Sequence, residues 1–495
     1  MRTLSSSSLF ICLLVLFLFG CKQKKQQESL DLPLNDQPNI LLIYTDDQSF
    51  MALQALGNSE IHTPTMDQLV AEGTTFTHAY NMGGWNGAIC LASRAMMISG
   101  RHIWRAQEFS GRLSENRETE KTWPKLMENQ GYETYMTGKW HISIPPDSLF
   151  NHVKSVLPGM PKDSPQGYNR PLSKNDTLWQ PWKKEYGGYW EGGQHWNELV
   201  RDDALSFISQ ASRSPNPFFM YVAFNAPHDP RQTPKSYVDA YQLDSIALPK
   251  SFVPEYPYAE AMGSGRELRD EMLAPFPRTE YAVKVNRQEY YALVTHLDEQ
   301  IKQILEALET YNLRENTYIF FTSDHGLAIG EHGLLGKQSM FDHSVRVPFV
   351  MIGPNIPKNK KINNDIYLQD IVATSLELAG AKKPAYIEFN SVLDLALGKT
   401  KKGYYDAIYG CYEQASQRMI RKDQFKLIVY QKISKVLLFD LEKDPLELED
   451  LSLDPLNAPL IKNMFLDLME LQQEMGDQLD LYPIFEILFK EDNTA

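Results

Sequence analysis

Cysteine is scarce in this 495-residue chain, which has four in total, at positions 12, 21, 90 and 411. Small secreted domains that depend on disulfides carry far more cysteine, so the composition excludes a disulfide scaffold. Two of the four lie within the first 21 residues, which leaves Cys90 and Cys411 for the rest of the chain. Cys90 follows the glycine-rich stretch Gly83-Gly84-Trp85-Asn86-Gly87. A cysteine in such a loop, in a chain with so few others, is a candidate for a chemical role.

The chain also lacks an excess of basic residues. Its 49 lysines and arginines are outnumbered by 63 acidic residues, which gives a formal net charge of −14. Proteins that bind nucleic acids usually carry a basic excess or a basic patch for the phosphates, so we expect no nucleic-acid partner. A small anionic substrate is still compatible with this charge, because it needs only a few cations in one pocket.

The N-terminal apolar run is too short to cross a bilayer. It covers 11 residues, Leu9 to Phe19, whereas a transmembrane helix needs about 20. We therefore predict a signal peptide over residues 1–20. The junction Gly20-Cys21 resembles the cleavage site of bacterial lipoproteins, with Cys21 as the lipidated residue, and residues 21–37 are predicted to be a polar tether. The prediction is an exported bacterial lipoprotein of the periplasm or outer membrane, attached to the membrane only by its lipid.

Four apolar stretches each end in a cluster of polar, reactive residues. Continuous apolar strands are buried on both faces, which is typical of a parallel sheet covered by helices. Helical patterns at 64–72 and 285–308 agree with this. Ligands bind beyond the carboxyl ends of the strands in such sheets, so the clusters are expected to form one site. The stretches are Asn39–Thr45 before Asp46-Asp47, Tyr132–Thr137 before Gly138-Lys139-Trp140-His141, Pro217–Phe224 before Asn225-Ala226-Pro227-His228, and Thr317–Ser323 before Asp324-His325-Gly326.

The length and spacing of the predicted strands change near residue 385. Short, closely spaced strands are predicted at 407–412, 424–430 and 436–440, followed by a helix over 459–479. The fold class predicted for the whole chain is therefore α/β. A large, mostly parallel sheet sandwiched by helices is expected at 38–385, and a smaller C-terminal domain of antiparallel strands plus a helix at 386–495.

Two adjacent carboxylates close the first predicted strand. An isolated Asp pair is most often a solvated turn, but at the end of a buried strand Asp46 and Asp47 would repel and raise each other's pKa. A divalent cation removes that penalty. Asp324 and His325 end another strand and can complete the shell. Three carboxylates suit a hard cation such as Ca²⁺, while one imidazole is less usual for it.

Cys90 opens a helical pattern that stops at Gly100. Taken alone, a cysteine is more often a small core residue than a nucleophile. At the start of a helix, however, its side chain faces the positive end of the helix dipole and free backbone N–H groups, which favour an oxyanion. Arg94 follows four residues later, on the same helix face one turn further on.

The stretch Cys90-Leu91-Ala92-Ser93-Arg94 resembles the C-x-P-x-R maturation signature of the formylglycine-dependent sulfatases, in the alkaline-phosphatase-like superfamily. The resemblance covers nearly all of residues 38–455. The passage Asp324 to Lys337 is most similar to sulfatases of acidic polysaccharides, the iduronate type included. The other blocks similar to the family occur in its order: Asp46-Asp47, Gly138-Lys139-Trp140-His141, His228-Asp229-Pro230, Ser323-Asp324-His325-Gly326, Gly330-Glu331-His332-Gly333, Gly336-Lys337, and Leu438-Phe439-Asp440-Leu441 with Asp444-Pro445.

The resemblance implies a hydrolase of sulfated carbohydrates. A formylglycine-generating maturase would oxidise residue 90, and its hydrated aldehyde would attack sulfur while bound to one calcium ion. Lys139 and His141, two residues apart, are expected on one strand face. The implied roles are metal ligands for Asp46, Asp47, Cys90, Asp324 and His325, charge neutralisation for Arg94, Lys139 and Lys337, general acid for His228, and general base for His141.

Two residues depart from the family pattern. Ala92 stands where proline is commonest, which leaves the identity of the maturing enzyme open. His325 stands where many members have asparagine, although the iduronate-type enzymes share the histidine.

Alternatives remain for the function and for one aromatic segment. A phosphonate or phosphodiester hydrolase of the same superfamily can also use formylglycine. A non-catalytic lipoprotein that binds sulfated glycans is a second alternative, but it would have no use for an acid and a base. The aromatic segment 161–196 is either a glycan subsite or the packing of a surface insertion; its residues are Trp179, Trp182, Tyr186, Tyr189, Trp190 and Trp196.

Overall fold

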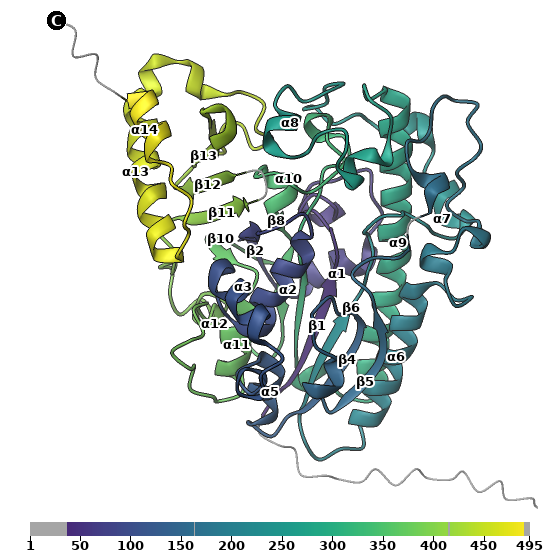
Figure 1. The fold of residues 1–495 in the computed structure, drawn as a ribbon. Helices are drawn as coiled ribbons and strands as arrows, with labels where there is room; N and C mark the ends of the chain where they lie inside the picture. Colours follow the sequence, from purple (N-terminus) through teal and green to yellow (C-terminus); the bar gives the residue numbers. More distant parts are fainter. Residues whose placement is uncertain (1–36, 163, 414–415, 490–495) are drawn as a thin grey trace, which may run out of the picture. The chain divides into compact units, whose positions relative to one another are not determined.

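A large mixed sheet organises residues 39–367. In the described residues nine strands join it, in the order β10-β2-β9-β7-β1-β6-β4-β5, with β8 paired to β2 (Figure 1). The run β7-β1-β6-β4-β5 is parallel, and β9 is antiparallel to both β7 and β2. The strands are β1 (Asn39–Thr45), β2 (Thr74–Tyr80), β4 (Glu133–Lys139), β5 (His152–Leu157), β6 (Phe218–Ala223), β7 (Thr317–Ser323), β8 (Arg346–Val347), β9 (Phe349–Ile352) and β10 (Lys360–Tyr367).

The computed structural model describes residues 37–162, 164–413 and 416–489, which belong to one compact unit. The predicted signal peptide, Cys21 and the tether up to residue 36 lie outside the described residues. Within the described ranges no helix is long and apolar enough to cross a membrane.

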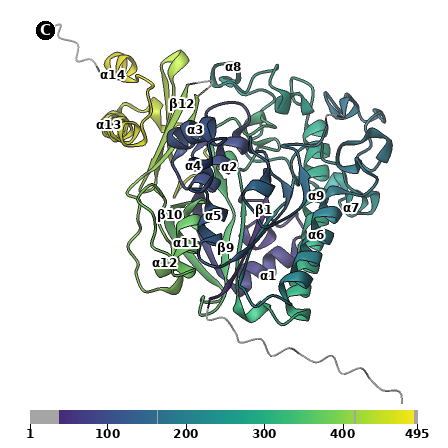
Figure 2. The ribbon, with the colours of Figure 1, turned by 60° about the horizontal axis from the view of Figure 1, so that its bottom comes forward.

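Helices cover both faces of this sheet because its strand residues alternate between two cores. Leu41 and Ile43 of β1 pack with α1 (Pro64–Glu72), α6 (Trp196–Ala211) and α9 (Glu280–Thr310). Ile40 and Leu42 pack on the other face, against a group of helices that includes α5 and α11 (Figure 2). That group is α2 (Ile89–Ser99), α3 (Ile103–Arg112), α5 (Trp123–Glu128), α11 (Asp370–Leu378) and α12 (Leu393–Leu397).

The predicted helix at 64–72 coincides with α1, and the pattern at 285–308 lies within α9. The prediction of a mostly parallel sheet sandwiched by helices is confirmed. Four shorter helices connect these elements: α4 (Asn116–Thr119), α7 (Lys235–Asp239), α8 (Ala259–Met262) and α10 (Asp342–Val345).

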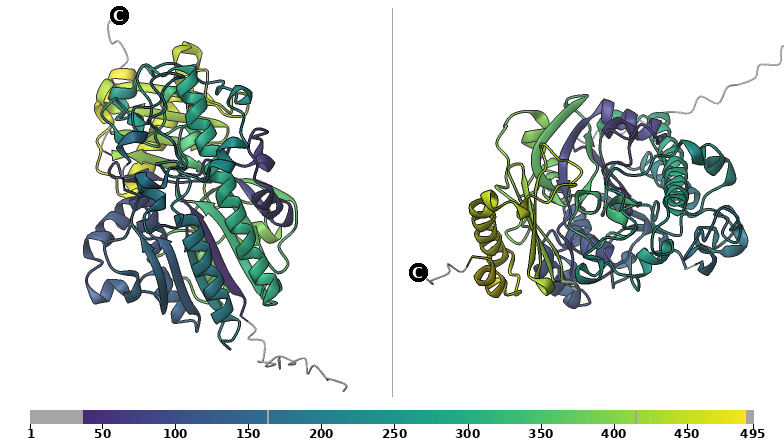
Figure 3. Two further views of the ribbon diagram at one scale, coloured as in Figure 1. Left: turned by 90° about the vertical axis from the view of Figure 1, so that its right-hand side faces the viewer. Right: turned by 90° about the horizontal axis from the view of Figure 1, so that it is seen from above.

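A second sheet of five described strands has the order β14-β13-β12-β11-β3. The strands β11 to β14 are antiparallel, as expected, and the helices α13 (Ala458–Met475) and α14 (Tyr482–Phe489) lie against its outer side (Figure 3). The strands are β11 (Ile408–Tyr412), β12 (Gln417–Lys422), β13 (Phe425–Tyr430) and β14 (Lys435–Asp440).

The fifth strand of this sheet comes from the N-terminal part of the chain. It is β3, only Gly83–Gly84, and it pairs in parallel with β11. The N–H of Cys411 also donates to Met82 O at 2.9 Å. The C-terminal sheet therefore fixes the loop that leads into Cys90 and α2.

Candidate active site

Neighbouring strand ends carry the acids and bases of the site. Asp46 and Asp47 follow β1 and Asp324 follows β7, two adjacent parallel strands. Lys139 is the last residue of β4, and His228 lies in the loop after β6. Because β7, β1, β6 and β4 are consecutive in the sheet, these side chains meet at one edge. The structure thus brings the predicted clusters together.

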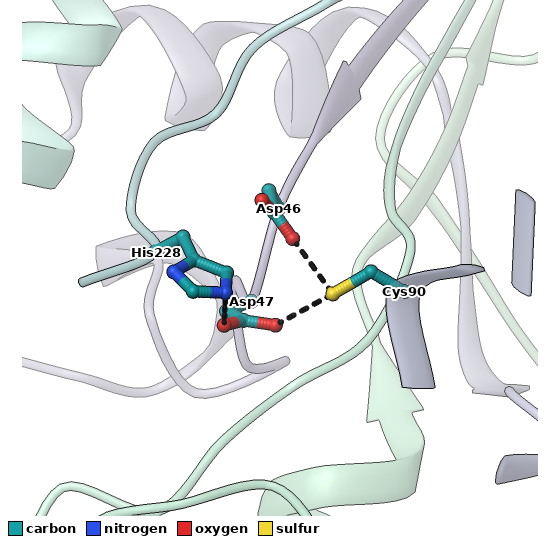
Figure 4. A group of neighbouring side chains, drawn as sticks. All are labelled: Asp46, Asp47, Cys90 and His228. Atoms are coloured by element: carbon teal, nitrogen blue, oxygen red, sulfur yellow. Dashed lines mark hydrogen bonds and ion pairs between the residues drawn. The ribbon is translucent and has the colours of Figure 1, made fainter. Parts of the chain in front are cut away.

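Cys90 enters this edge from the first turn of α2. Its side chain is buried, and its sulfur lies 3.2 Å from Asp46 Oδ1 and 3.6 Å from Asp47 Oδ1 (Figure 4). Lys337 Nζ is 3.0 Å from the same sulfur. Burial and the nearby charges of Asp324 and Asp46 raise the pKa of the Cys90 thiol well above its usual value. An unmodified Cys90 is therefore a neutral thiol and a poor nucleophile.

Each of the three carboxylates at the strand ends is paired with one cation. Lys139 Nζ contacts Asp46 Oδ2, Lys337 Nζ lies 2.7 Å from Asp47 Oδ2, and Arg94 Nε lies 3.0 Å from Asp324 Oδ2. All six side chains are at most 3% exposed. Buried charges are tolerated when they are paired in this way.

The three carboxylates have different pKa values. Burial and the adjacent Asp324 raise the pKa of Asp46 to about 6. For Asp47, burial acts upward but Lys337 and His228 outweigh it, so its pKa lies below the usual range. At Asp324 the charges of Arg94 and Lys139 likewise outweigh the effect of burial, so the pKa of this carboxyl group is lowered. The site therefore holds ionised carboxylates at its centre.

His228 faces the cysteine from the loop after β6. Its Nε2 lies 3.6 Å from Asp47 Oδ2, while Nδ1 points away, 3.1 Å from Asp229 Oδ1 (Figure 4). Burial and Lys337 lower its pKa, but Asp47 and Asp229 more than compensate, and the net shift is upward. A protonated His228 can donate from Nε2 into the site while Nδ1 stays bonded to residue 229.

His141 reaches the site differently from the sequence expectation. We expected strand alternation to place it on the face of Lys139, but β4 ends at Lys139 and His141 has φ 58°. The expectation is wrong because the backbone leaves extended geometry here, with a positive φ at a non-glycine residue. Burial, Lys139 and Arg94 lower the pKa of His141 to about 3. Its imidazole is therefore neutral near pH 7.

Gly138 lies within β4, beside an irregularity in the pairing of β4 with β5. It has φ 94°, and a Cβ at this position would lie 1.8 Å from Ala223 O of the neighbouring strand. Only glycine fits, because it has no Cβ and tolerates positive φ. This explains why a glycine precedes Lys139.

A cavity of about 400 Å³ opens onto these groups. Cys90, His141, His228 and Lys337 line it, whereas Arg94 and Lys139 are fully buried behind the carboxylates. Apart from Gly87 of the glycine-rich stretch, the rest of the lining was not predicted from the sequence. The remaining lining residues are Gly87, Ala88, Pro158, Gly159, Met160, Leu268, Arg269, Asp270 and Gln338.

A second cavity, of about 470 Å³, is larger but contains none of the predicted catalytic residues. Glu331 and His332 line this second cavity and not the one at Cys90. Glu331 Oε1 pairs with Arg287 at 3.0 Å, and its Oε2 accepts from Ile329 N at 2.6 Å. These contacts give Glu331 a structural role in the loop that leads to Lys337.

The residues present fit a bound divalent cation. Asp46, Asp47, Cys90 and His228 offer ligand atoms within 4.8 Å of one another. Asp324 is adjacent, since its Oδ1 accepts from Asp47 N at 3.2 Å. Nδ1 of His325 lies 2.7 Å from Gly326 O, and its buried Nε2 has no hydrogen-bond partner among the described residues. Such a set of hard oxygen donors with one free imidazole nitrogen can hold a cation.

Comparison with known families identifies the family of the chain. The sulfatase family profile matches residues 38–381, and the profile of the C-terminal region of N-sulphoglucosamine sulphohydrolase matches residues 330–474. The chain therefore belongs to the sulfatase family, and it is a sulfuric ester hydrolase.

Two curated relatives illustrate the similarity. Arylsulfatase K of Canis lupus familiaris is 30% identical over 443 residues, which cover 84% of this chain and 79% of the relative. The ulvan-active sulfatase of Formosa agariphila is 28% identical over 497 residues, or 94% of this chain and 87% of the relative. Among solved structures, BT4656 in complex with its substrate D-glucosamine-2-N,6-O-disulfate has a TM-score of 0.71 at 22% identity and covers 89% of this chain and 99% of that one.

Proposed function

We propose that this sulfatase removes sulfate from sulfated carbohydrates through a formylglycine formed from Cys90. The observation that carries the proposal is the position of Cys90 at the start of α2, in contact with Asp46, Asp47 and Lys337 inside the cavity. Burial and the acidic neighbours raise the pKa of this thiol well above its usual value, which disfavours the thiolate that a cysteine nucleophile needs. Oxidation by a maturase gives this side chain a use, because a hydrated aldehyde supplies a hydroxyl nucleophile.

Calcium is the cofactor proposed for the carboxylate cluster. Asp46, Asp47, Asp324 and His325 would hold the ion beside residue 90. When bound, a divalent cation supplies positive charge that lowers the pKa of a hydroxyl and polarises a sulfuryl oxygen.

The cations paired with the carboxylates prepare the cavity for an anionic ester. Of Arg94, Lys139 and Lys337, only Lys337 lines the cavity, so its ammonium group can contact a sulfuryl oxygen as well as residue 90. Arg94 and Lys139 do not line the cavity. They pair with Asp324 and Asp46 and keep these carboxylates ionised and in place. Fixed positive charge in a buried site stabilises a transition state more than it would in water.

Proton transfer is assigned to the two histidines of the cavity. His228 presents Nε2 to the site with a raised pKa, which suits protonation of the leaving alcohol. His141 is neutral and can accept the proton whose removal expels sulfate. The hydroxyl group of a sugar is a poor leaving group unless an acid protonates it, so an acid and a base in the cavity suit the hydrolysis of carbohydrate sulfates.

The relatives support a carbohydrate substrate. One is the N-acetylglucosamine-6-O-sulfatase of Bacteroides thetaiotaomicron, 25% identical over 557 residues. A phosphonate monoester hydrolase of Agrobacterium radiobacter shares the fold at a TM-score of 0.69 and 19% identity, which makes phosphonate esters the alternative substrate class. We also propose that the enzyme is exported as a lipoprotein through Cys21, with its catalytic part in the periplasm.

The test is sulfate release from a panel of defined sulfated oligosaccharides, measured by ion chromatography, with phosphonate monoesters in parallel. The proposal expects turnover of at least one sulfated sugar and its loss in Cys90→Ala. Turnover of phosphonate esters with no release from any sulfated glycan would favour the alternative.

A further inference from the structure

The loop that carries His228 is held by side chains far from it in sequence. Asp229 is 4% exposed, and its carboxylate is shared among three groups. Its Oδ1 lies 3.1 Å from His228 Nδ1, while its Oδ2 lies 2.7 Å from Arg269 Nη1 and accepts from the Tyr168 hydroxyl at 2.7 Å. Arg269 also approaches Oδ1 with Nη2, at 3.4 Å. The orientation of this carboxylate is therefore fixed from two sides.

Because the Asp229 carboxylate is held in one orientation, the orientation of the His228 imidazole is held as well. His228 Nδ1 is hydrogen-bonded to the backbone oxygen of Asp229 at 2.8 Å and forms an ion pair with the Asp229 carboxylate at 3.1 Å. Because Nδ1 is bound to residue 229, the other ring nitrogen, Nε2, faces Asp47 and the cavity. A histidine whose second nitrogen is bonded to a carboxylate keeps one ring orientation, as in other hydrolase sites.

The aromatic segment supplies much of this support. Tyr168 reaches Asp229, and the hydroxyl of Tyr189 donates to His228 O at 3.0 Å. The backbone N–H of Tyr189 donates to Gln232 Oε1 at 2.8 Å, and His195 Nε2 lies 3.0 Å from Gln232 O. Tyr189 and His195 are buried and their rings stack, with centroids 5.0 Å apart. The segment therefore packs against the loop from 228 to 232.

We propose that Asp229 is a positioning residue for His228, and that the Tyr168 hydroxyl and Arg269 hold it in place. The inference rests on the proposed acid role of His228. It assigns a function to the segment around Tyr168 to His195, which supports the catalytic loop. Asp229 is not among the residues that line the cavity at Cys90, so its effect on the reaction passes through the imidazole.

The experiment compares phenyl sulfate, which has a poor leaving group, with 4-nitrophenyl sulfate, which has a good one. A misplaced acid slows only the ester that needs protonation. For Asp229→Asn we expect kcat on phenyl sulfate to fall about 10- to 100-fold with little change in KM, and a much smaller loss on 4-nitrophenyl sulfate. Tyr168→Phe removes one hydroxyl and is expected to give the same pattern with smaller losses.

Tyr186→Phe is the matched control. It makes the same substitution in the same segment, but the Tyr186 hydroxyl donates to Leu178 O at 2.6 Å and not to Asp229. It should leave both substrates unchanged. Equal losses on the two esters in Asp229→Asn, or none, would overturn the inference. His228→Ala separates the two proposals, because equal losses in that variant would instead refute the acid role itself.

A spectroscopic readout keeps the inference testable if a variant is too slow to measure. In enzyme labelled with ¹⁵N-histidine, the His228 signals are assigned from their absence in His228→Ala. Asp229→Asn should shift the Nδ1 resonance, and Tyr186→Phe should not. Unchanged His228 resonances in Asp229→Asn would show that the carboxylate does not orient the ring.

Discussion

Lys337 Nζ lies 2.7 Å from both carboxylate oxygens of Asp47 and 3.0 Å from the sulfur of Cys90. One ammonium group thus contacts a candidate metal ligand and the candidate nucleophile together. Burial would lower the pKa of Lys337, but the carboxylate of Asp47 more than compensates, so the pKa is raised and the side chain stays charged. The relationship places a charged ammonium group beside residue 90, where the proposed mechanism needs a cation for the sulfuryl group.

Replacing Lys337 should therefore slow the reaction more than it weakens binding. Lys337→Met is expected to lower kcat by about 10²- to 10³-fold, because it removes a preorganised charge at the reacting group. Steady-state kinetics on 4-nitrophenyl sulfate measure the loss. Lys250→Ala is the control, since Lys250 is an exposed lysine that lines the other cavity. A Lys337→Met variant with kcat near that of the parent would contradict the role.

Active enzyme should carry an aldehyde at residue 90. No lysine or arginine lies between Gln26 and Ser93, so trypsin alone gives an unwieldy peptide, whereas an added Glu-specific protease releases residues 73–94. Mass spectrometry of that peptide should show formylglycine, and an aldehyde-reactive hydrazide should label the intact protein. Cys411→Ala should keep the label and Cys90→Ala should lose it. An active preparation with only unmodified cysteine would refute the nucleophile.

Much of the site was predictable because its residues follow strands that the sequence marks clearly. The runs before Asp46, His228 and Asp324 are mostly apolar, since both faces of the sheet are covered, whereas the run before Lys139 includes Glu133 and two threonines. Parallel strands bring the ends of these runs to one edge. The family resemblance then supplied Cys90, Arg94 and Lys337, which no periodic pattern marks as reactive.

The remaining features had no local signal. Tyr168 and Arg269 lie 61 and 40 residues from Asp229, in loops whose course depends on tertiary packing. The two-residue strand β3 is too short to be marked by alternation. The face of His141 was mispredicted because Gly138 and His141 both have positive φ, which a strand-period argument cannot anticipate.

Removal of the metal should abolish turnover reversibly. Chelation followed by dialysis is expected to inactivate the enzyme, and Ca²⁺ should restore activity. Binding should also raise the melting temperature, since a ligand at 100 times its Kd stabilises the folded state by about 2.7 kcal/mol. Asp47→Asn should lose this thermal response, whereas Asp202→Asn on the exposed face of α6 should keep it. Full activity of Asp47→Ala after exhaustive chelation would exclude a metal role.

The proposed lipid anchor can be tested by fractionation. With Cys21 present we expect the protein in the membrane fraction, releasable by detergent, and Cys21→Ala should give soluble exported protein. Cys411→Ala provides a cysteine control that should stay in the membrane fraction. If Cys21→Ala left the distribution unchanged, an uncleaved N-terminal anchor would explain the attachment better than a lipid.

The pH dependence should report the ionisation of His228. Its folded-state pKa is raised above 6.5, and the proposed acid is the protonated form. Activity on phenyl sulfate should therefore be present below that raised pKa and fall as the pH rises through it. His141, with a pKa lowered to about 3, remains neutral across this range and adds no limb near neutrality.

Asp229 contributes to the upward shift of the His228 pKa, so Asp229→Asn should move the alkaline limb to lower pH, while Tyr186→Phe should not. Rate profiles of kcat/KM against pH, in calcium-saturated buffer, measure the displacement. An alkaline limb that stays in place in Asp229→Asn and also in His228→Ala would assign it to another group.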